Sequence, residues 1–321
     1  MQWLARTPNF DFVRYRYVAM VASGLLSLVA LAVLFYPGLN YGLDFTGGII
    51  VEADYSRPVE LDEIRSALAD AGFESAQVQN YGSVSAVLIR LPPQDDDATA
   101  EEGAAESVAV PLSVQERLLQ VLRTQDPEVE IRRSDSVGGQ VGEELFENAG
   151  LALMFALIMV FVYVMLRFRW KLAVGAIVAT LHDILVTAGI YALSGWTFDL
   201  TVLGSLLAVL GYSINDTIVV YDRIRDNFRL MRRGSAEAIV NASVNQTLAR
   251  TLVTGVTSML VLAALMLIGG DTMFGFSVTL IIGILVGTYS SIYVASSMAL
   301  ALKVAPSDFI ETKQKQVDEL P

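Results

Sequence analysis

Six long apolar runs dominate the pattern of hydrophobic and polar positions along this chain of 321 residues. Each run is close to the ~20 residues with which an α-helix crosses the hydrocarbon core of a bilayer. The runs lie at 17–36, 149–166, 172–193, 200–221, 252–268 and 274–304. This pattern predicts an α-helical polytopic membrane protein with six transmembrane helices, the last of them long enough to tilt or to contain a break.

A different periodicity appears between the first two runs, at 38–148. Strands are predicted at 49–55, 76–80, 84–91 and 128–134, and helices at 60–71 and after the capping-box sequence SVQE at 113–116. The resulting order βαββαβ is that of the ferredoxin-like split motif. Because this α+β domain shows no constellation of catalytic residues, we interpret it as a binding or lever domain.

Two segments of the α+β domain stand apart from its strands and helices. The stretch 92–110 is acidic and free of aromatic residues, which predicts a disordered insert. The sequence GLDFTGG precedes the first strand and forms a structural motif of three glycines and one acid, Gly42, Asp44, Gly47 and Gly48. Glycine clusters can hold phosphate, but no helix start follows this one, so a tight turn with close backbone approach is favoured.

The composition supports the membrane interpretation and excludes several kinds of site. Hydrophobic residues make up 54% of the chain and charged residues only 17%, which is too apolar for an ordinary soluble domain. The absence of cysteine excludes disulfides, thiolate nucleophiles and cysteine metal sites, and leaves the redox compartment open. Because His182 is the one histidine, a multi-histidine zinc site is also excluded.

Charge is distributed unevenly between the α+β domain and the rest. The whole chain carries a formal net charge of −12, yet 38–148 holds 22 acidic and 7 basic residues, and the remainder holds 12 acidic and 15 basic residues. An acidic domain of this kind is unsuited to nucleic acid or to anionic lipid. No nucleic-acid partner is therefore expected.

Basic residues mark one end of the predicted helices, which fixes their orientation by the positive-inside rule. They precede the first run, separate the second from the third, and follow the fourth and sixth: Arg6, Arg14, Arg16, Arg167, Arg169, Lys171, Arg223, Arg225, Arg229, Arg232, Arg233, Lys303, Lys313 and Lys315. Both termini are thus expected in the cytoplasm and the α+β domain outside. The expected parts are an N-terminal segment 1–16, a first helix 17–37, a five-helix region 149–304 with a cytoplasmic loop 222–250, and a tail 305–321. The first run has no cleavage site after it, so an uncleaved anchor is expected.

An acidic residue, Asp216, interrupts the fourth apolar run. A charge at this depth costs about 2.5–3.5 kcal/mol on insertion scales, so such residues usually face a partner, a cavity or a proton path. Ser205, Ala208 and Tyr212 follow helical spacing from Asp216, which suggests close contact with another helix or a narrow wet crevice. A purely structural hydrogen bond at a helix interface is the alternative interpretation.

Arg250 opens the fifth run and offers a partner for this acid. Burial favours the neutral form of a carboxylic acid, whereas a nearby guanidinium favours the charged form. Moving Arg250 toward or away from Asp216 would therefore make the acid release or hold a proton. Because Arg250 lies near a cytoplasmic boundary, snorkelling and positive-inside charge explain it equally well.

The third run carries a second polar group near its middle, His182 followed by Asp183. A histidine–aspartate pair occurs in metal-dependent phosphohydrolases, but these need more histidines than the chain has, so a packed polar pair is favoured. Asn215, Tyr212 and Asp222 of the fourth run are further supporting candidates, although Asp222 lies at the run's cytoplasmic end, where solvation is expected.

An ordered series of motifs resembles the SecF branch of the SecD/SecF protein-export family. The motifs are FDFVRYRY at 10–17, GLDFTGG at 42–48, LHD at 181–183, GYSINDTIVVYDRIRDNF at 211–228, QTLART at 246–251, GFS at 275–277 and GTYSSIYVAS at 287–296. The resemblance implies half of a twelve-helix fold of the resistance-nodulation-division (RND) type in the bacterial inner membrane. It also implies SecD as the companion half and Asp216 and Arg250 as the proton-coupling residues.

The same resemblance implies work on preproteins at the SecYEG channel, driven by the proton-motive force, with YajC as a further expected partner. Protons are the expected coupling ion, sodium is the alternative, and no cofactor is expected. No nucleotide-binding loop occurs in the sequence, which favours an ion-driven transport subunit over an enzyme. Two rival functions remain open: half of an RND exporter of small molecules or lipids, and a scaffold that stabilises the channel without transport.

Overall fold

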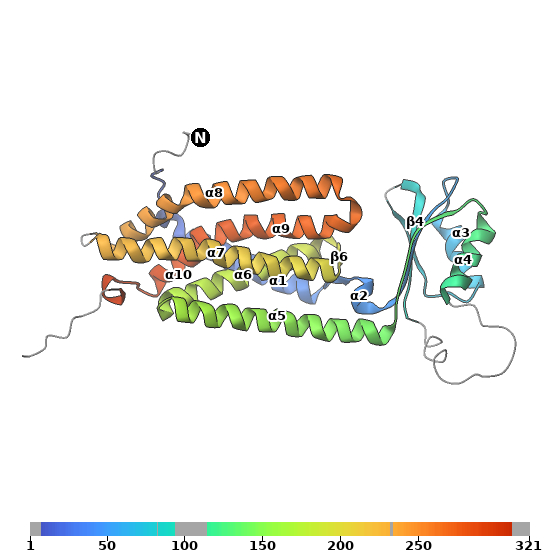
Figure 1. Ribbon diagram of the computed structural model, residues 1–321, viewed down its shortest axis with the longest axis horizontal. Coiled ribbons are helices and arrows are strands. Elements are labelled where there is room, and N and C mark those ends of the chain that lie inside the picture. The colour runs from blue at the N-terminus through green and yellow to red at the C-terminus, as the bar shows by residue number, and fades with distance from the viewer. Residues whose placement is uncertain (1–7, 82, 94–113, 232–233, 310–321) are drawn as a thin grey trace, which may run out of the picture. The chain divides into compact units, whose positions relative to one another are not determined.

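The computed structural model describes residues 8–81, 83–93, 114–231 and 234–309 (Figure 1). The chain divides into two compact units. One unit combines Met1–Asn40 with Ala152–Pro321, and the other is Tyr41–Leu151. The first unit is a helical bundle and the second is the α+β unit.

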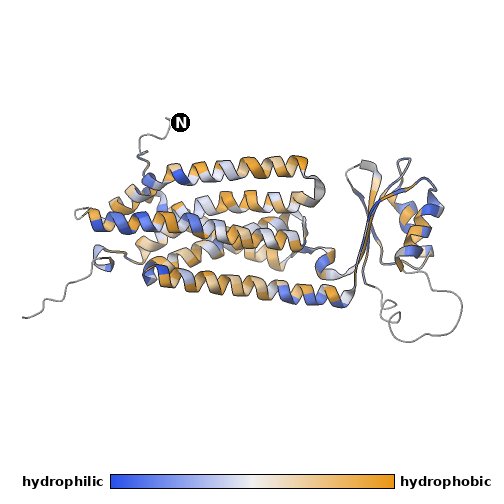
Figure 2. Cartoon of the chain, viewed as in Figure 1, coloured by the Kyte–Doolittle hydropathy of each residue, from blue (hydrophilic) through white to orange (hydrophobic). Residues whose placement is uncertain are grey.

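Six helices in the described part of the chain are long and apolar enough to cross a membrane, as the sequence predicts. They are α1 (Arg16–Phe35), α5 (Gly139–Arg167), α6 (Trp170–Ser194), α7 (Leu200–Leu230), α8 (Ala236–Ile268) and a last span that joins α9 (Gly270–Ser290), the π-helical turn η3 (Ser291–Ala295) and α10 (Ser296–Ala301). Short elements flank them: η1 (Val13–Tyr15), β1 (Asn40–Tyr41), β6 (Thr197–Phe198) and η4 (Pro306–Asp308). Figure 2 shows apolar residues along most of their length. The chain is a multi-pass membrane protein.

The six helices are unequally buried. In their most apolar windows α6 is 56% buried and α7 50%, whereas α5 and α8 are each 11% buried. Helix α9 packs against α6, α7 and α8, so α6, α7 and α9 form the interior of the bundle. The apolar sides of the outer helices therefore need lipid or another subunit to cover them.

Small residues allow the bundle helices to approach closely. A Cβ placed on Gly283 of α9 would lie 2.1 Å from Val209 of α7, and one on Gly189 of α6 would lie 2.5 Å from the Cβ of Ala30 on α1. Close backbone approach at small residues is the usual basis of helix association in a membrane, where lipid tails remove the hydrophobic driving force.

Three helices, α5, α7 and α8, extend beyond their predicted ends. Most of the segment 222–250, expected as a loop, is helical, because α7 continues to Leu230 and α8 already begins at Ala236. Helix α5 likewise begins at Gly139, ahead of the predicted start at 149. Hydropathy detects only the apolar centre of a helix, and the extensions of α7 and α8 bury one side while exposing charge on the other.

The segment before α1 is held against α8 by two asparagines one turn apart. The Nδ2 groups of Asn241 and Asn245 donate to the carbonyl of Phe10 at 3.0 and 2.8 Å. In return their Oδ1 atoms accept from backbone N–H groups, Asn245 from Phe10 and Asn241 from Phe12, both at 2.9 Å. The FDFVRYRY motif thus includes a segment whose backbone is hydrogen-bonded to side chains of α8.

The α+β unit has the predicted βαββαβ order. Its elements are β2 (Gly48–Asp54), α3 (Leu61–Asp70), β3 (Gln77–Tyr81), β4 (Ser83–Leu91), α4 (Val114–Gln125) and β5 (Glu130–Val137). The sheet order is β3-β4-β2-β5 with antiparallel neighbours, the arrangement of a ferredoxin-like domain. Its core joins one sheet face to the apolar sides of α3 and α4: Ile49, Val51, Ala53, Tyr55, Ile64, Leu68, Phe73, Val78, Val87, Ile89, Leu91, Val114, Leu118, Leu122 and Val129.

The glycine motif at 42–48 contains a one-turn helix, α2 (Leu43–Thr46), where the sequence indicated only a turn. Gly47 and Gly48 follow it with φ of +65° and +109°, conformations that favour glycine. A Cβ on Gly48 would lie 2.1 Å from the carbonyl oxygen of Leu91 on the neighbouring strand. The two glycines therefore let β2 enter the sheet. The acidic insert expected at 92–110 lies, apart from its first two residues, outside the described residues, as does the capping residue Ser113.

An acid at the end of α4 holds the loop after β2. The side chain of Asp126 accepts hydrogen bonds from the backbone and hydroxyl of Ser56, the latter at 2.8 Å, and from the N–H of Glu128 at 3.0 Å. The Ser56 hydroxyl is the main reason that the pKa of Asp126 lies below its usual value. Beside it, burial raises the pKa of Tyr55 to about 12.

Ser56→Ala is therefore expected to destabilise the α+β unit in a pH-dependent way. A lowered pKa in the folded state contributes stability above the unfolded-state pKa, and this contribution is lost as the pH falls through the folded-state pKa. Hydrogen–deuterium exchange of β2 peptides should show faster opening in the variant at neutral pH and convergence with the original chain in acid. Ser66→Ala, which removes a hydroxyl bonded to a backbone carbonyl, is the matched control and should show no such convergence. A difference that persists unchanged in acid would refute the assignment.

Candidate functional site

The buried acid of α7 is held by α8. Asp216 is 8% exposed, and the hydroxyl of Thr251 on α8 donates to its Oδ1 at 2.6 Å. Its Oδ2 is buried without a hydrogen-bond partner among the described residues. A buried carboxylate with one oxygen unsatisfied is costly when charged, so this site is suited to take up a proton.

Asp216 is buried because it lies on the side of α7 that faces the interior of the bundle, while the opposite side is exposed. The helix begins at Asp199, whose side chain caps it by accepting from the N–H of Val202 at 2.8 Å. From there one side buries small hydroxyl residues together with the acid: Ser205, Ser213, Asp216 and Thr217. The opposite side exposes Gly204, Ala208, Gly211 and Asn215.

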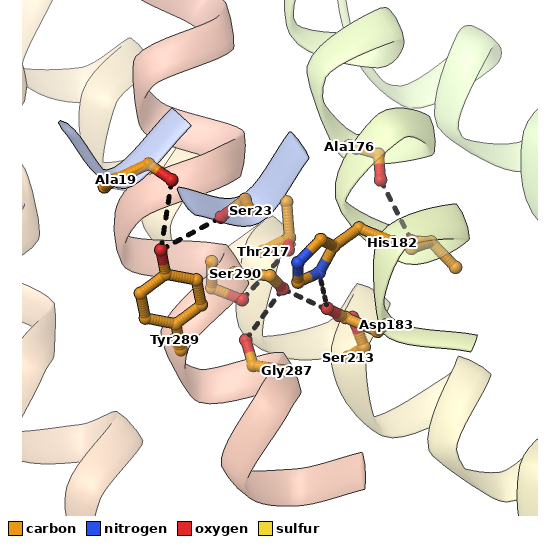
Figure 3. A network of polar contacts seen from close by, with 12 residues as sticks. Ala19, Ser23, Ala176, His182, Asp183, Ser213, Thr217, Gly287, Tyr289 and Ser290 are labelled. Carbon is orange, nitrogen blue, oxygen red and sulfur yellow. Dashed lines mark hydrogen bonds and ion pairs between the residues drawn. The ribbon is translucent and has the colours of Figure 1, made fainter. Parts of the chain in front are cut away.

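A second acid also lies in the interior of the bundle, but its carboxylate accepts several hydrogen bonds. We refer to the two acids and the side chains that bond around them as the interior layer. Asp183 of α6 is completely buried and accepts three hydrogen bonds: from Nδ1 of His182 at 2.9 Å, from Ser213 of α7 at 2.5 Å and from Ser290 of α9 at 2.7 Å (Figure 3). Three helices thus meet at one carboxylate. Asp183 is satisfied by its surroundings, whereas one oxygen of Asp216 is not.

The break in the last span lies beside this layer. Ser291, the first residue of the π-helical turn η3, shares a hydrogen bond of 3.0 Å with Thr217. At the other end of η3 the carbonyl of Ala295 accepts from Tyr221 at 2.8 Å. π-helical turns are rare and occur frequently at functional sites. The last span, expected to tilt or to contain a break, thus contains a π-helical turn, and α7 supplies side chains to both ends of that turn.

Arg250 occupies the position before Thr251 but not the same environment. Its side chain is exposed, and no ion pair within 4.0 Å joins it to Asp216, both of which the structure describes. The sequence leaves open whether Arg250 contacts Asp216, and in this conformation the two described residues form no ion pair. Because Thr251 and Arg250 share one helical turn, any rotation of α8 that breaks the Thr251 bond also moves the guanidinium.

The other candidate residues divide between the interior layer and its surroundings. Asp222 lies beyond the layer, where it forms ion pairs with Arg167 of α5 at 2.7 Å and with Arg225 at 3.1 Å; it connects two helices instead of being merely solvated. Asn215 is exposed next to Asp216. The residues that follow helical spacing from Asp216 on α7 do not all share its burial: Ala208 is exposed and Tyr212 is half-buried.

Several residues of the layer were not predicted. Thr251, Ser213, Ser290, Ser291 and Thr217 all bond within it. Ser213 is three residues from Asp216, a helical spacing that sequence inspection can find. The pairing of α6, α7, α8 and α9 has no such local signal.

The described residues contain no cluster of three or more metal-ligating side chains of the kind that holds a metal ion. What the layer offers instead is one buried acid with an unsatisfied oxygen, a hydroxyl donor from a neighbouring helix and a histidine–aspartate pair. Carboxylic acids and imidazoles are the groups that most often bind and release protons in proteins.

Two family models match the chain. "Protein export membrane protein SecD/SecF, C-terminal" covers residues 117–305, and the "SecD/SecF GG Motif" covers residues 33–59. The second match contains the glycine motif whose backbone admits β2 to the sheet.

Curated relatives extend the match to the full length. The chain is 41% identical to the protein translocase subunit SecF of Pseudomonas aeruginosa, over 98% of each chain, and 42% identical to that of Vibrio alginolyticus, over 100% of this chain and 99% of the relative. Among solved structures it resembles SecDF of Thermus thermophilus, a translocon-associated membrane protein, with a TM-score of 0.79 and 37% identity. That alignment covers 93% of this chain but 39% of the SecDF chain. From its six-helix bundle, its ferredoxin-like unit and these relatives, the chain belongs to the SecD/SecF family of protein export membrane proteins, in its SecF branch.

Proposed function

We propose that the chain works with SecD as a proton-driven subunit that promotes protein export through the SecYEG channel, without hydrolysing a nucleotide. The observation that carries this proposal is the state of Asp216. It is a buried acid of α7 whose Oδ1 is bonded to Thr251 of α8 and whose Oδ2 has no partner among the described residues. Such an acid binds or loses a proton at the cost of rearranging its neighbours.

The proposed cycle alternates two arrangements of α7 and α8. With the proton lost, the carboxylate attracts donors, so α8 turns its Thr251 and Arg250 toward α7. With the proton bound, the attraction fades and α8 relaxes. Each charge that crosses the membrane field supplies about 2.3 kcal/mol per 100 mV, so a few protons can drive a movement of the α+β unit against a bound polypeptide.

The exposed side of α7 supports SecD as the companion half. It presents Gly204, Ala208 and Gly211, and a Cβ on either glycine would meet no atom within 4 Å. A helix side of small residues lets a second helix approach closely in a membrane. The SecDF chain, of which this chain matches 39%, has ample length for such a partner half.

The charge pattern supports the proposed orientation. Arg16, Lys171 and Lys303 lie at one end of the bundle, where Arg16 pairs with Glu237 at 2.6 Å and Lys171 donates to the carbonyl of Lys303 at 3.0 Å. We refer to this as the basic end. By the positive-inside rule it faces the cytoplasm of a bacterial inner membrane, with both termini inside and the α+β unit outside.

Thr251→Val is expected to weaken the proton-driven part of export several-fold while leaving the chain folded. The variant keeps the shape of the side chain but removes the donor, and a hydrogen bond to a charged group contributes about 1.5–3 kcal/mol. Export into vesicles with and without an imposed proton gradient measures the effect. Thr251→Ser keeps the hydroxyl and should restore most of the gradient-dependent export; equal defects in both variants would argue for a packing role instead.

A further inference from the structure

A groove between α1 and α6 leads to the imidazole of His182. It has a volume of about 360 Å³. Its wall combines apolar side chains with two serines and a glycine of α1: Met20, Ser23, Gly24, Ser27, Val178, Leu181, His182, Leu185, Val294 and Met298. Beyond the residues that line the groove, α1 and α6 come into contact where Gly189 of α6 meets Ala30 of α1.

A second cavity, of about 320 Å³, adjoins the groove toward the basic end. Met20 lines both cavities, and the second is otherwise lined in part by charged groups, Arg16, Glu237 and Lys303. The two cavities are therefore neighbours on the same side of the bundle, one at the level of His182 and the other near the charged surface.

His182 has one ring nitrogen that its neighbours leave unsatisfied. Nδ1 is bonded to Asp183, and Nε2 is buried without a partner among the described residues, although the side chain is only 5% exposed. Figure 3 shows the ring between α6 and the side of α1 that carries Ser23, with its second nitrogen turned away from Asp183. If Nδ1–H donates to Asp183, Nε2 carries a lone pair that no described residue satisfies.

The depth of His182 decides what can bind there. It lies at the midpoint of α6 (Trp170–Ser194), roughly 18 Å from either end at a rise of 1.5 Å per residue. Phospholipid head groups do not reach this depth. A water molecule in the groove would find three polar partners in Nε2, Ser23 and Ser27, within the two to four that a buried water requires.

We propose that the two cavities form a hydrated route from the basic end of the bundle to Nε2 of His182, and that this histidine exchanges protons with that side of the membrane. A hydronium ion donates its proton to the Nε2 lone pair and leaves as water, and the reverse step returns the proton. The imidazolium so formed is paired with Asp183, which holds Ser213 of α7 and Ser290 of α9. His182 thus acts as a positioning residue for α7, and this inference rests on the proposed proton-driven function.

The groups around His182 limit the number of alternative proton acceptors. Its own helix supplies Asp183, α7 supplies Asp216, α9 supplies Tyr289, and η3 supplies Tyr293. Tyr289 is already bonded to Ser23 at 2.9 Å and to the carbonyl of Ala19 at 3.2 Å. At this level α1 contributes only hydroxyl groups to the groove.

Cysteine labelling tests the hydration of the route, since the chain has no native cysteine. A membrane-impermeant thiosulfonate reacts with thiolates in water. Ser27→Cys in the assembled complex is expected to react quickly from the basic end of the bundle, and Val29→Cys, exposed on the outer surface of α1, to react little. Adding Gly24→Leu should block the Ser27→Cys reaction, because it fills the groove, whereas Ala22→Leu should not. Equal, slow reaction of both cysteines would overturn the route and would indicate a lipid-filled groove.

Nitrogen-15 NMR tests the proton exchange, since the chain has a single histidine. The signals of labelled complex that disappear in His182→Gln belong to His182. They are expected to shift between neutral and charged imidazole as the pH falls, and to lose this response in the Gly24→Leu variant. Signals that stay fixed over the whole range of pH would overturn the proposal. Neither experiment requires export, so their failure is distinguishable from a failure of the proposed function at Asp216.

Discussion

Asp216→Asn is expected to abolish the proton-driven part of export and to leave the chain folded in its complex. The amide has nearly the same shape and still accepts from Thr251, so the packing of α7 against α8 should survive. It cannot bind and release a proton, so the two arrangements of the helices no longer alternate with the gradient. Export into vesicles should fall to the level measured without a gradient.

The matched control for this variant is Asp226→Asn, which removes an exposed acid from the same helix. It should export as the original chain does. Full gradient-dependent export by Asp216→Asn, at normal membrane levels and with SecD co-purifying, would support the scaffold function instead. Unprocessed preproteins upon depletion would favour export of proteins, whereas drug sensitivity alone would favour an exporter of small molecules.

Gly48→Ala is expected to prevent the α+β unit from folding. The residue has φ of +109°, which costs a side chain of order 1–3 kcal/mol. In addition, the new Cβ would lie 2.1 Å from the carbonyl oxygen of Leu91, at the start of the β2–β4 ladder where Ile49 pairs with Leu91. Backbone atoms at this distance must separate, so the strands lose their register. Membrane levels of the chain and protease resistance of the unit should both collapse.

Gly72→Ala separates the two contributions. Gly72 also has a positive φ, +90°, but a Cβ there meets no atom within 4 Å. Gly72→Ala introduces the backbone strain without the clash. It should therefore lower the stability of the α+β unit by only the smaller of the two contributions, and the unit should stay folded. If both variants fold equally well, the glycine motif does not serve to admit β2 to the sheet.

The fold follows from the sequence wherever one side of an element is apolar over its whole length. The six spans and the βαββαβ order were predictable because hydropathy and periodicity record burial directly. The ends of α7 and α8 were not, because their buried residues alternate with charges that hydropathy averages away. The helix α2 was missed because four residues between glycines resemble a turn.

The sequence was sufficient to identify the two buried acids of the site but not the residues that contact them. Asp216 and Asp183 are conspicuous because charged residues are costly in a membrane. Their different surroundings depend on which hydroxyl groups neighbouring helices supply, and Thr251 and Ser290 are separated from these acids by more than thirty residues. Whether Arg250 reaches Asp216 could not be read from the sequence, and the structure places Thr251 against the acid.

The central claim is that Asp216 changes its protonation state during export. Infrared difference spectroscopy of the reconstituted complex tests this claim most directly. Comparison with Asp216→Asn identifies the carboxyl band of this residue. The band of the protonated acid is expected to appear and disappear as the pH or the membrane voltage is changed. A band that stays in one form while gradient-driven export continues would contradict the account.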